Sequence, residues 1–223
     1  DGQDPDYFYS DSIPLTIGEL RKNIKDYEQK KVAFEGLVSR VAGQTAYVED
    51  YDYEDEQMYG MSVYMGYTAY PFIKKGNICR IIGTVSYYEG GGTYQVSGLT
   101  YMEFRPDYKY NSKLISEGHD VIPTEITADQ LANGNNILST NVQMNNLEVI
   151  DVYTTKNGES AGAMTLTCRT TDNKNVSVRT EVIYKDANQT VKLAEADVLN
   201  KIINVNGIVD YYDGSYQVKV FTM

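Results

Sequence analysis

The sequence has no tryptophan, a single histidine (His119) and only two cysteines. One histidine excludes any metal site with two histidine ligands and most catalytic arrangements that rely on histidine. Two cysteines exclude a disulfide-rich scaffold. No apolar run in the sequence approaches the roughly 18–20 residues that a membrane-spanning helix needs. These absences leave an ordinary globular protein as the expectation.

Basic residues are also scarce, because 20 Lys and Arg stand against 31 Asp and Glu, for a net charge of −11. Along the chain the net charge is −4 over 1–12, −3 over 13–104, 0 over 105–122 and −4 over 123–223. Proteins that bind nucleic acid through its phosphates carry surplus Lys and Arg. Strong nonspecific binding of nucleic acid is therefore disfavoured, and binding through a local basic patch remains as the alternative.

The two cysteines, Cys79 and Cys168, each lie in an alternating apolar run. Such positions favour two buried free thiols, with a disulfide between them as the alternative. The opening residues 1–12, DGQDPDYFYSDS, are acidic and without periodicity, which predicts a disordered spacer. Because the sequence starts at Asp1 rather than Met, we expect that a leader was removed. A tether behind a lipidated or cleaved N-terminus fits this spacer, as does an ordinary frayed terminus.

An internal repeat is the most informative feature of the sequence. Residues 78–96 read ICRIIGTVSYYEGGGTYQV and residues 202–218 read IINVNGIVDYYDGSYQV, with matching Ile, Gly, Val, Tyr-Tyr and Gly at a constant offset. After a two-residue difference in the turn, Tyr-Gln-Val recurs in both. Two copies of one structural unit, of about 90–100 residues each, are therefore expected.

Upstream of these motifs, each half opens with a Thr-x-x-Glu/Gln capping box, Thr16 to Glu19 and Thr127 to Gln130. This pattern predicts short helices over about 16–24 and 127–133. Further on, Gly36 and Asn146 align within a strand, and both tolerate the positive φ that a bulge or sharp bend requires.

Alternation of apolar and polar residues predicts five strands in each half. In the first half they cover 30–41, 44–50, 59–66, 78–88 and 93–103. In the second they cover 140–153, 161–169, 174–180, 201–212 and 215–222. Five strands with an insert between the third and fourth indicate a small closed barrel. The expected domains are repeat 1 over 13–104, a linker over 105–122 and repeat 2 over 123–223.

A capped helix, a bent first strand and a G-x-V-x-Y-Y-x-G hairpin into Y-Q-V together resemble the bacterial tandem OB-fold proteins. That family includes extracytoplasmic lipoproteins of unknown role and modules of secreted nucleases. The resemblance covers 13–104 and 123–223 and implies two five-stranded OB barrels in an all-β chain. It implies a location outside the cytoplasm, secreted or anchored by an N-terminal lipid. No nuclease domain accompanies the barrels, so the resemblance implies no catalysis.

Ligands of OB folds usually lie across the outer face of the second and third strands. In repeat 1 alternation turns Ala46, Val48, Met61 and Val63 inward, which leaves Tyr47, Glu49 and Tyr64 outward. Tyr47 and Tyr64 can form a stacking platform for bases or sugar rings. In repeat 2 the outward residues include Arg169 and Arg179. One repeat thus offers aromatics and the other cations, and neither combines them; outward Tyr and Thr are also simply good strand formers.

The repeated tyrosine pairs divide between core and surface. Alternation places Tyr87 and Tyr211 with core residues and turns Tyr88 and Tyr212 outward beside the hairpins. The glycines of these hairpins are turn chemistry rather than a phosphate loop, since they join strand to strand.

The acidic run 49–56 suggests a Ca²⁺ site, but its spacing does not match an EF-hand loop. An EF-hand loop starting at Asp50 needs Gly at its sixth position and Glu at its twelfth, where this chain has Asp55 and Met61. We therefore expect a solvated acidic loop, no metal site and no cofactor. His119 has acidic neighbours in the linker and is expected to be a solvated residue.

The expected function is non-catalytic binding or adaptor work on an unknown protein or glycan partner. The alternative is single-stranded oligonucleotide binding through Tyr47 and Tyr64 or through Arg169 and Arg179. Hydrolysis is disfavoured, because Ser, Thr and Asp show no nucleophile–base spacing.

Overall fold

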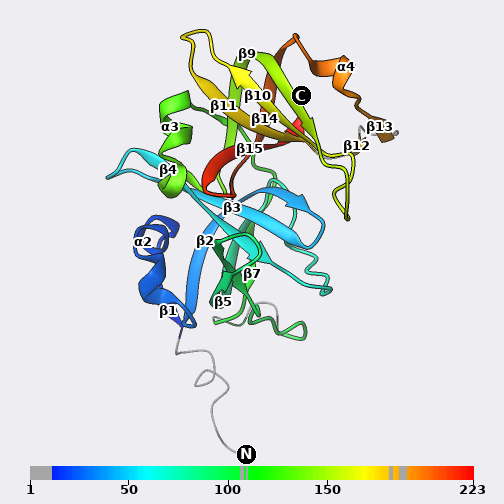
Figure 1. The fold of residues 1–223 in the computed structure, drawn as a ribbon. Helices are drawn as coiled ribbons and strands as arrows, with labels where there is room; N and C mark the ends of the chain where they lie inside the picture. Colours follow the sequence, from blue (N-terminus) through cyan, green and yellow to red (C-terminus); the bar gives the residue numbers. More distant parts are fainter. Residues whose placement is uncertain (1–11, 106–107, 109, 181–182, 186–189) are drawn as a thin grey trace, which may run out of the picture. The chain divides into compact units, whose positions relative to one another are not determined.

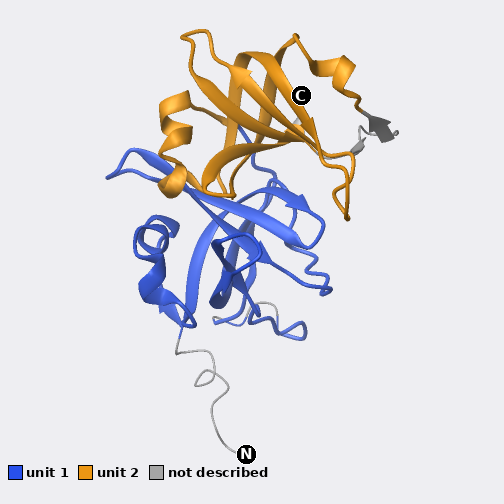
Figure 2. Cartoon of the chain, viewed as in Figure 1, with its two compact units in different colours: residues 1–122 blue, residues 123–223 orange. Residues whose placement is uncertain are grey.

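The chain forms two closed β-barrels, one in each half (Figure 1). The computed structural model describes residues 12–105, 108, 110–180, 183–185 and 190–223. The predicted spacer 1–12 therefore lies outside the described residues, except for its last position. The chain divides into two compact units, Asp1–Ile122 and Pro123–Met223 (Figure 2).

The first unit has five barrel strands, with a short helix and two further strands beside them. The barrel strands are β2 (Lys31–Ala42), β3 (Thr45–Asp52), β4 (Gln57–Tyr64), β5 (Ile78–Tyr88) and β6 (Thr93–Ser97). The other elements are β1 (Ile13–Pro14), α2 (Ile17–Lys22), a 3₁₀ turn (Ile24–Tyr27) and β7 (Lys113–Ser116). Pairing runs β2–β3–β4–β6–β5 and returns from β5 to β2, so the sheet closes.

The second unit repeats this plan. Its barrel strands are β9 (Asn141–Thr154), β10 (Met164–Arg169), β11 (Asn175–Thr180), β14 (Ile202–Tyr212) and β15 (Ser215–Thr222). Its other elements are β8 (Thr124–Glu125), α3 (Ala128–Ala132), a 3₁₀ turn (Gly134–Ile137), β12 (Ile183–Lys185), β13 (Thr190–Lys192) and α4 (Glu195–Val198). Pairing runs β9–β10–β11–β15–β14 and returns to β9.

In both barrels the third strand in chain order pairs in parallel with the fifth. Val63 on β4 lies opposite Val96 on β6, and Val178 on β11 lies opposite Val218 on β15. All other pairs within the barrels are antiparallel. The prediction of an all-β chain with two closed, OB-like five-stranded barrels is confirmed.

The glycine of the repeated G-x-V motif is required by close strand approach. A Cβ on Gly83 would lie 2.8 Å from Val96 Cγ1 and 2.9 Å from the carbonyl oxygen of Ser97. At the equivalent Gly207, a Cβ would overlap the carbonyl oxygen of Lys219. The motif therefore places a glycine where the last two strands of each barrel lie too close together for a side chain.

Each barrel encloses its own apolar core. The first core includes Phe34, Met61 and Ile81, and the second includes Leu147, Leu166 and Val209. Cys79 and Cys168 are free and buried, as predicted, one in each core. Burial raises the pKa of both thiols to about 12, so neither is a thiolate at neutral pH.

Both predicted capping boxes begin a helix, although each helix is shorter than its predicted range. Glu19 N donates to Thr16 Oγ1 at 3.0 Å at the start of α2. At α3 both bonds of the box are present, with Gln130 N donating to Thr127 Oγ1 and Thr127 N donating to Gln130 Oε1. A 3₁₀ turn follows each helix, and apolar residues of the turn pack against the core of the barrel.

The predicted strand bend is correct for Asn146 and wrong for Gly36. Asn146 has a φ of 57°, next to a register shift between β9 and β14. Gly36 has no positive φ. Glycine fits this position because any side chain would collide: a Cβ would lie 2.7 Å from Val48 Cγ1 and 2.8 Å from Ile17 Cδ1. The two aligned positions thus serve different purposes.

The segment predicted as a linker, 105–122, contributes to the first unit. Within it β7 pairs with β5. Ser112 and Asn111 are fully buried, and Ile82 N donates to Ser112 Oγ at 2.9 Å. The last strand of this barrel also ends at Ser97 rather than at 103, because Gly98 turns the chain with a φ of 58°.

The prediction that Tyr87 belongs to the core is wrong, since its side chain is 44 % exposed. The strand β2 pairs with β5 only as far as Thr84, so the end of β5 continues with β6 as a two-stranded ribbon. The Tyr87 ring packs against Tyr94 with centroids 5.1 Å apart. Its counterpart Tyr211 is partly buried against the second core and packs on Tyr216 at 5.2 Å.

Candidate binding surfaces

Tyr47 and Tyr64 lie on the outer face of the first barrel. Tyr47 is opposite Ser62 and Tyr64 is opposite Thr45, so the two rings are diagonal neighbours on β3 and β4. Tyr64 is at the border of exposure, and its hydroxyl donates to Gln44 Oε1 at 3.1 Å. Tyr47 is half-buried. The pair places two aromatic rings on this face, and the Tyr64 hydroxyl is bound within the protein.

Tyr88 and Tyr212 project beside the hairpins of the two barrels, as alternation predicted. Tyr88 is 54 % exposed, and its ring lies over the glycine turn, where a Cβ on Gly91 would approach Tyr88 Cδ1 to 2.7 Å. Tyr212 is 65 % exposed and stands opposite Ser215. Tyr88 therefore shapes its own turn, whereas Tyr212 is available to solvent.

The two predicted arginines have different settings on the second barrel. Arg169 is exposed, with Glu148 and Asn175 opposite it on the neighbouring strands. Arg179 is half-buried, and two threonine hydroxyls hold its guanidinium: Nη1 donates to Thr165 Oγ1 and Nη2 to Thr155 Oγ1, both at 2.9 Å. Only Arg179 is oriented by the surrounding fold.

A row across four strands places an aromatic ring near this arginine. Tyr153 on β9 faces Thr165 on β10, which faces Arg179 on β11, which in turn faces Lys219 on β15. Tyr153 is 60 % exposed. The second barrel therefore combines an aromatic side chain with cations on one face, contrary to the expectation that neither repeat does so.

Alternation alone misplaces Tyr153 because β9 contains a bulge. The register between β9 and β10 shifts so that Ile150 has no partner between Val149 and Asp151. The extra residue exchanges the two faces of the strand and turns Tyr153 outward. The one signal in the sequence is Asp151, which uninterrupted alternation would place in the core.

On the first unit, a groove of about 670 Å³ lies along the edge of β2. Strand β1 pairs with β2 only at Val32 and Ala33, and β3 pairs with it from Leu37 onward. The groove opens in the gap between these pairings. Its walls combine apolar, aromatic and charged side chains, including Leu37, Met58, Ile78, Tyr51, Glu35 and Arg80.

Carboxylates dominate the charge of this groove. Glu19, Glu35, Glu49 and Asp50 line it, against Arg80 as the basic side chain in the lining. Burial raises the pKa of Asp50, and the nearby carboxylates of Asp52 and Glu35 raise it further, against a backbone hydrogen bond from Tyr51.

Glu49, predicted outward, is only 2 % exposed. It lies between Leu37 and Gly60 on the neighbouring strands. Alternation assigns a face to a strand residue but does not show what covers that face, so the burial of this carboxylate was not predicted.

The rest of the acidic run forms a local structural network. Asp52 Oδ1 accepts from Glu54 N and Asp55 N and so caps the turn. Asp55 Oδ2 accepts from Lys22 Nζ at 2.7 Å and from the Tyr59 hydroxyl at 2.6 Å. These bonds fasten the β3–β4 hairpin to α2. Among the described residues, no group of three or more His, Cys, Asp or Glu is placed to hold a metal ion.

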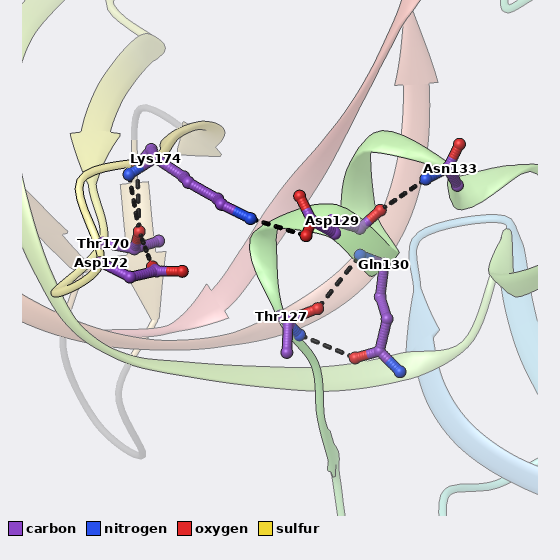
Figure 3. Close-up of polar contacts among 7 residues, drawn as sticks. All are labelled: Thr127, Asp129, Gln130, Asn133, Thr170, Asp172 and Lys174. Atoms are coloured by element: carbon purple, nitrogen blue, oxygen red, sulfur yellow. Dashed lines mark hydrogen bonds and ion pairs between the residues drawn. The ribbon is translucent and has the colours of Figure 1, made fainter.

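A smaller hollow of about 410 Å³ lies on the second unit, between α3, β11 and the β14–β15 hairpin. Figure 3 shows how the helix is held there: Lys174 Nζ reaches Asp129 Oδ2 at 2.6 Å, beside the capping box of Thr127 and Gln130. Thr170 bonds Asp172 and accepts from Lys174 N, so the β10–β11 turn is ordered as well. The polar groups in Figure 3 thus bond to one another, and they lie outside the lining of this hollow.

His119 is exposed, and its Nε2 forms a hydrogen bond of 2.7 Å with Ser116 Oγ. Its backbone N–H donates to the carbonyl of Gly76, which ties the chain to the first barrel. Asp120 and Glu117, its acidic neighbours in sequence, are also exposed.

Comparison of the chain with known protein families and with curated proteins finds no match. Within the described part of the chain, no helix combines the length and the apolar character needed to cross a bilayer.

Proposed function

We propose that this protein is a non-catalytic binding or adaptor protein that holds a protein or glycan partner on its first barrel. The observation that carries the proposal is the groove along β2. Its volume of about 670 Å³ falls in the range of about 300–1,000 Å³ typical of ligand sites. Its lining combines apolar side chains with a few polar groups, which is the usual composition of such sites.

The side chains of the groove suit recognition rather than bond making. Tyr51 is 40 % exposed and packs edge-on against Tyr53 at 4.9 Å, which leaves part of its ring open to a ligand. Leu37, Ile78 and Met58 supply apolar contact. A partly exposed aromatic ring beside carboxylates can contact both sugar rings and peptide side chains.

The experiment presents the labelled full-length chain to an array of neutral and acidic oligosaccharides and to a panel of peptides of mixed charge. Replacing Tyr51 with Ala weakens binding about tenfold, since an aromatic anchor at a binding site contributes on the order of 1–2 kcal/mol. Tyr67→Ala is the matched control, because Tyr67 is 97 % exposed and does not line the groove. Saturable binding by no probe, or equal loss in both variants, contradicts the proposal.

We place the protein outside the cytoplasm, secreted or held by a lipid at the N-terminus. The resemblance of the repeated motifs to extracytoplasmic tandem OB-fold proteins supports this location. Fractionation of the source cells followed by mass spectrometry of the mature N-terminus tests it. A chain recovered only from the cytoplasmic fraction contradicts this part of the proposal.

Single-stranded nucleic acid is a second candidate ligand, and the row on the second barrel favours it. Arg179 has two of its five N–H donors bound to threonine hydroxyls, and the exposed ring of Tyr153 stands two strands away. An aromatic ring beside an oriented cation is the pairing that single-strand binders use.

Anisotropy titration of a labelled single-stranded oligonucleotide mixture, at low and at physiological salt, tests this candidate. Affinity that falls steeply with salt and falls again in both Tyr153→Ala and Arg179→Ala supports it. Lys201→Ala removes an exposed charge outside the row and serves as the control. Absence of binding even at low salt removes nucleic acid from consideration.

A further inference from the structure

We infer that the occupant of the β2 groove is a basic segment of a partner protein, bearing lysine or arginine side chains. This inference rests on the binding function proposed above and adds the chemistry of the ligand. It combines three properties of the groove: the charge of its lining, its apolar and aromatic surface, and the stretch of β2 that lies between its pairings with β1 and β3.

The lining carries a formal charge that selects a cation. Three exposed carboxylates, those of Glu19, Glu35 and Asp50, line the groove together with one guanidinium, that of Arg80. The register places Arg80 directly opposite Glu35. Arg21, the buried base of α2, donates to the carbonyl of Gly60 and does not line the groove. An anionic ligand is therefore repelled, and a cationic one gains Coulomb energy in a partly desolvated site.

The apolar part of the lining suits the long stems of lysine and arginine. Leu37, Met58 and Ile78 supply surface on which a methylene chain can pack while its charged head reaches a carboxylate. Tyr51 adds a ring face for a cation. A small inorganic cation uses only the carboxylates, whereas a basic side chain contacts both kinds of surface.

The strand edge favours a polypeptide over a single small molecule. Between the pairing of β1 at Ala33 and that of β3 at Leu37, the residues Phe34, Glu35 and Gly36 line the groove. An extended segment lying along this edge can place alternate side chains toward the carboxylates and toward Tyr51.

The test measures binding of two labelled peptides to the full-length chain by fluorescence anisotropy. One peptide alternates lysine with serine, and its match carries glutamate in place of every lysine. We expect saturable binding of the lysine peptide alone. Glu35→Gln and Asp50→Asn each weaken it about two- to fivefold, the size expected for one partly exposed charge pair. Glu89→Gln makes the same charge change at the exposed β5–β6 turn and leaves the affinity unchanged.

Both groove variants replace a carboxylate by an amide of the same shape, and equal melting temperatures would show that the fold is intact. Equal binding of the two peptides, or equal effects of Glu89→Gln and the groove variants, overturns the inference. If a neutral oligosaccharide binds instead and Tyr51→Ala removes it, the inference fails while the proposed function stands. If no probe binds, both fail.

Discussion

Single residues of this protein are constrained chiefly by close approach of the strands and by backbone turns with positive φ. In the described part of the chain, seven residues other than glycine have positive φ, and two of them, Gln29 and Ser139, precede the first strand of each barrel. The repeat therefore preserves a backbone turn where the side chain has changed. Steric requirements of this kind give sharper predictions than the identity of surface side chains.

Gly83→Ala should destabilise the first barrel by about 1–3 kcal/mol, the usual cost of overpacking a closed site. The added methyl group meets the backbone oxygen of Ser97 at 2.9 Å as well as Val96, and neither can move without opening the β5–β6 pairing. Urea denaturation measures the change.

Gly90→Ala is the matched control for that substitution. Its Cβ would meet only the ring of Tyr88, an exposed side chain that can rotate away. A loss of stability in Gly90→Ala equal to that in Gly83→Ala would contradict the explanation from close strand approach.

The pH dependence of stability has an identified contributor in Asp55. Hydrogen bonds from Lys22 and then Tyr59 lower the pKa of this carboxyl below its ordinary 3.8. A carboxyl with a lowered folded-state pKa stabilises the fold above its unfolded pKa, and the contribution is lost as pH falls through the folded value. Asp55→Asn should therefore reduce stability at neutral pH and make no difference in strong acid.

Thermal melts of wild type and Asp55→Asn across the acid range measure this difference. The exposed Asp120, for which no side-chain bond is found, provides the control variant Asp120→Asn. A wild-type advantage that persists unchanged at the acid limit would show that the interaction of Asp55 is not ionic. Since Lys22 and Asp55 are both surface groups, raised salt should also shrink the advantage.

Among the elements, the two capped helices hold one end of each barrel. Thr127→Ala should destabilise the second unit by about 1 kcal/mol, because α3 loses the acceptor for Gln130 N. Thr171→Ala, an exposed threonine in the β10–β11 turn, should leave stability unchanged. Chemical denaturation of both variants compares them, and equal values would show that the capping box adds nothing beyond helix propensity.

The elements were predictable from the sequence, and the candidate sites were only partly so. Alternation located all ten barrel strands, because every strand buries one face and exposes the other. Tyr153 was missed because the bulge at Ile150 reverses the faces of β9. Tyr87 was misplaced because β5 runs beyond the barrel, where nothing encloses its side chain.

The β2 groove could not be predicted from the local alternation of apolar and polar residues. It arises from the register at which β1 leaves β2 and β3 joins it, and pairing registers between distant segments are not encoded in alternation. The acidic run gave a signal for part of its lining, through Glu49 and Asp50. Arg80, Leu37 and Ile78 come from strands whose neighbours only the closed barrel defines.

At the scale of the whole molecule, duplication has produced two barrels with one topology and different surfaces. The first has an acidic groove beside Tyr51, and the second has Tyr153 in a row with Arg179 and Lys219. Since the two faces have opposite electrostatic character, they suit different ligands. A protein of this design can connect two partners, which is the adaptor role that we propose.

The separate cores predict that each unit folds without the other. The two core clusters share no residue, and each barrel closes through its own strands. A fragment of residues 1–122 and one of residues 123–223 should each unfold cooperatively in urea, with a CD spectrum typical of β structure. A fragment that remains unfolded would show that its barrel depends on the other unit.

A shorter fragment, residues 1–104, tests where the first unit ends. It lacks β7 and the buried pair Asn111 and Ser112, so Ile82 N loses its bond to Ser112 Oγ and Met102 N its bond to Asn111 Oδ1. The truncation removes the acceptors of these two N–H groups, and a typical intramolecular hydrogen bond contributes about 0.5–1.5 kcal/mol to stability. The midpoint of urea unfolding should therefore be lower for residues 1–104 than for residues 1–122. Equal midpoints would show that residues 105–122 are only a linker. A lower midpoint for residues 1–104 would show that 105–122 belong to the folding unit of the first barrel.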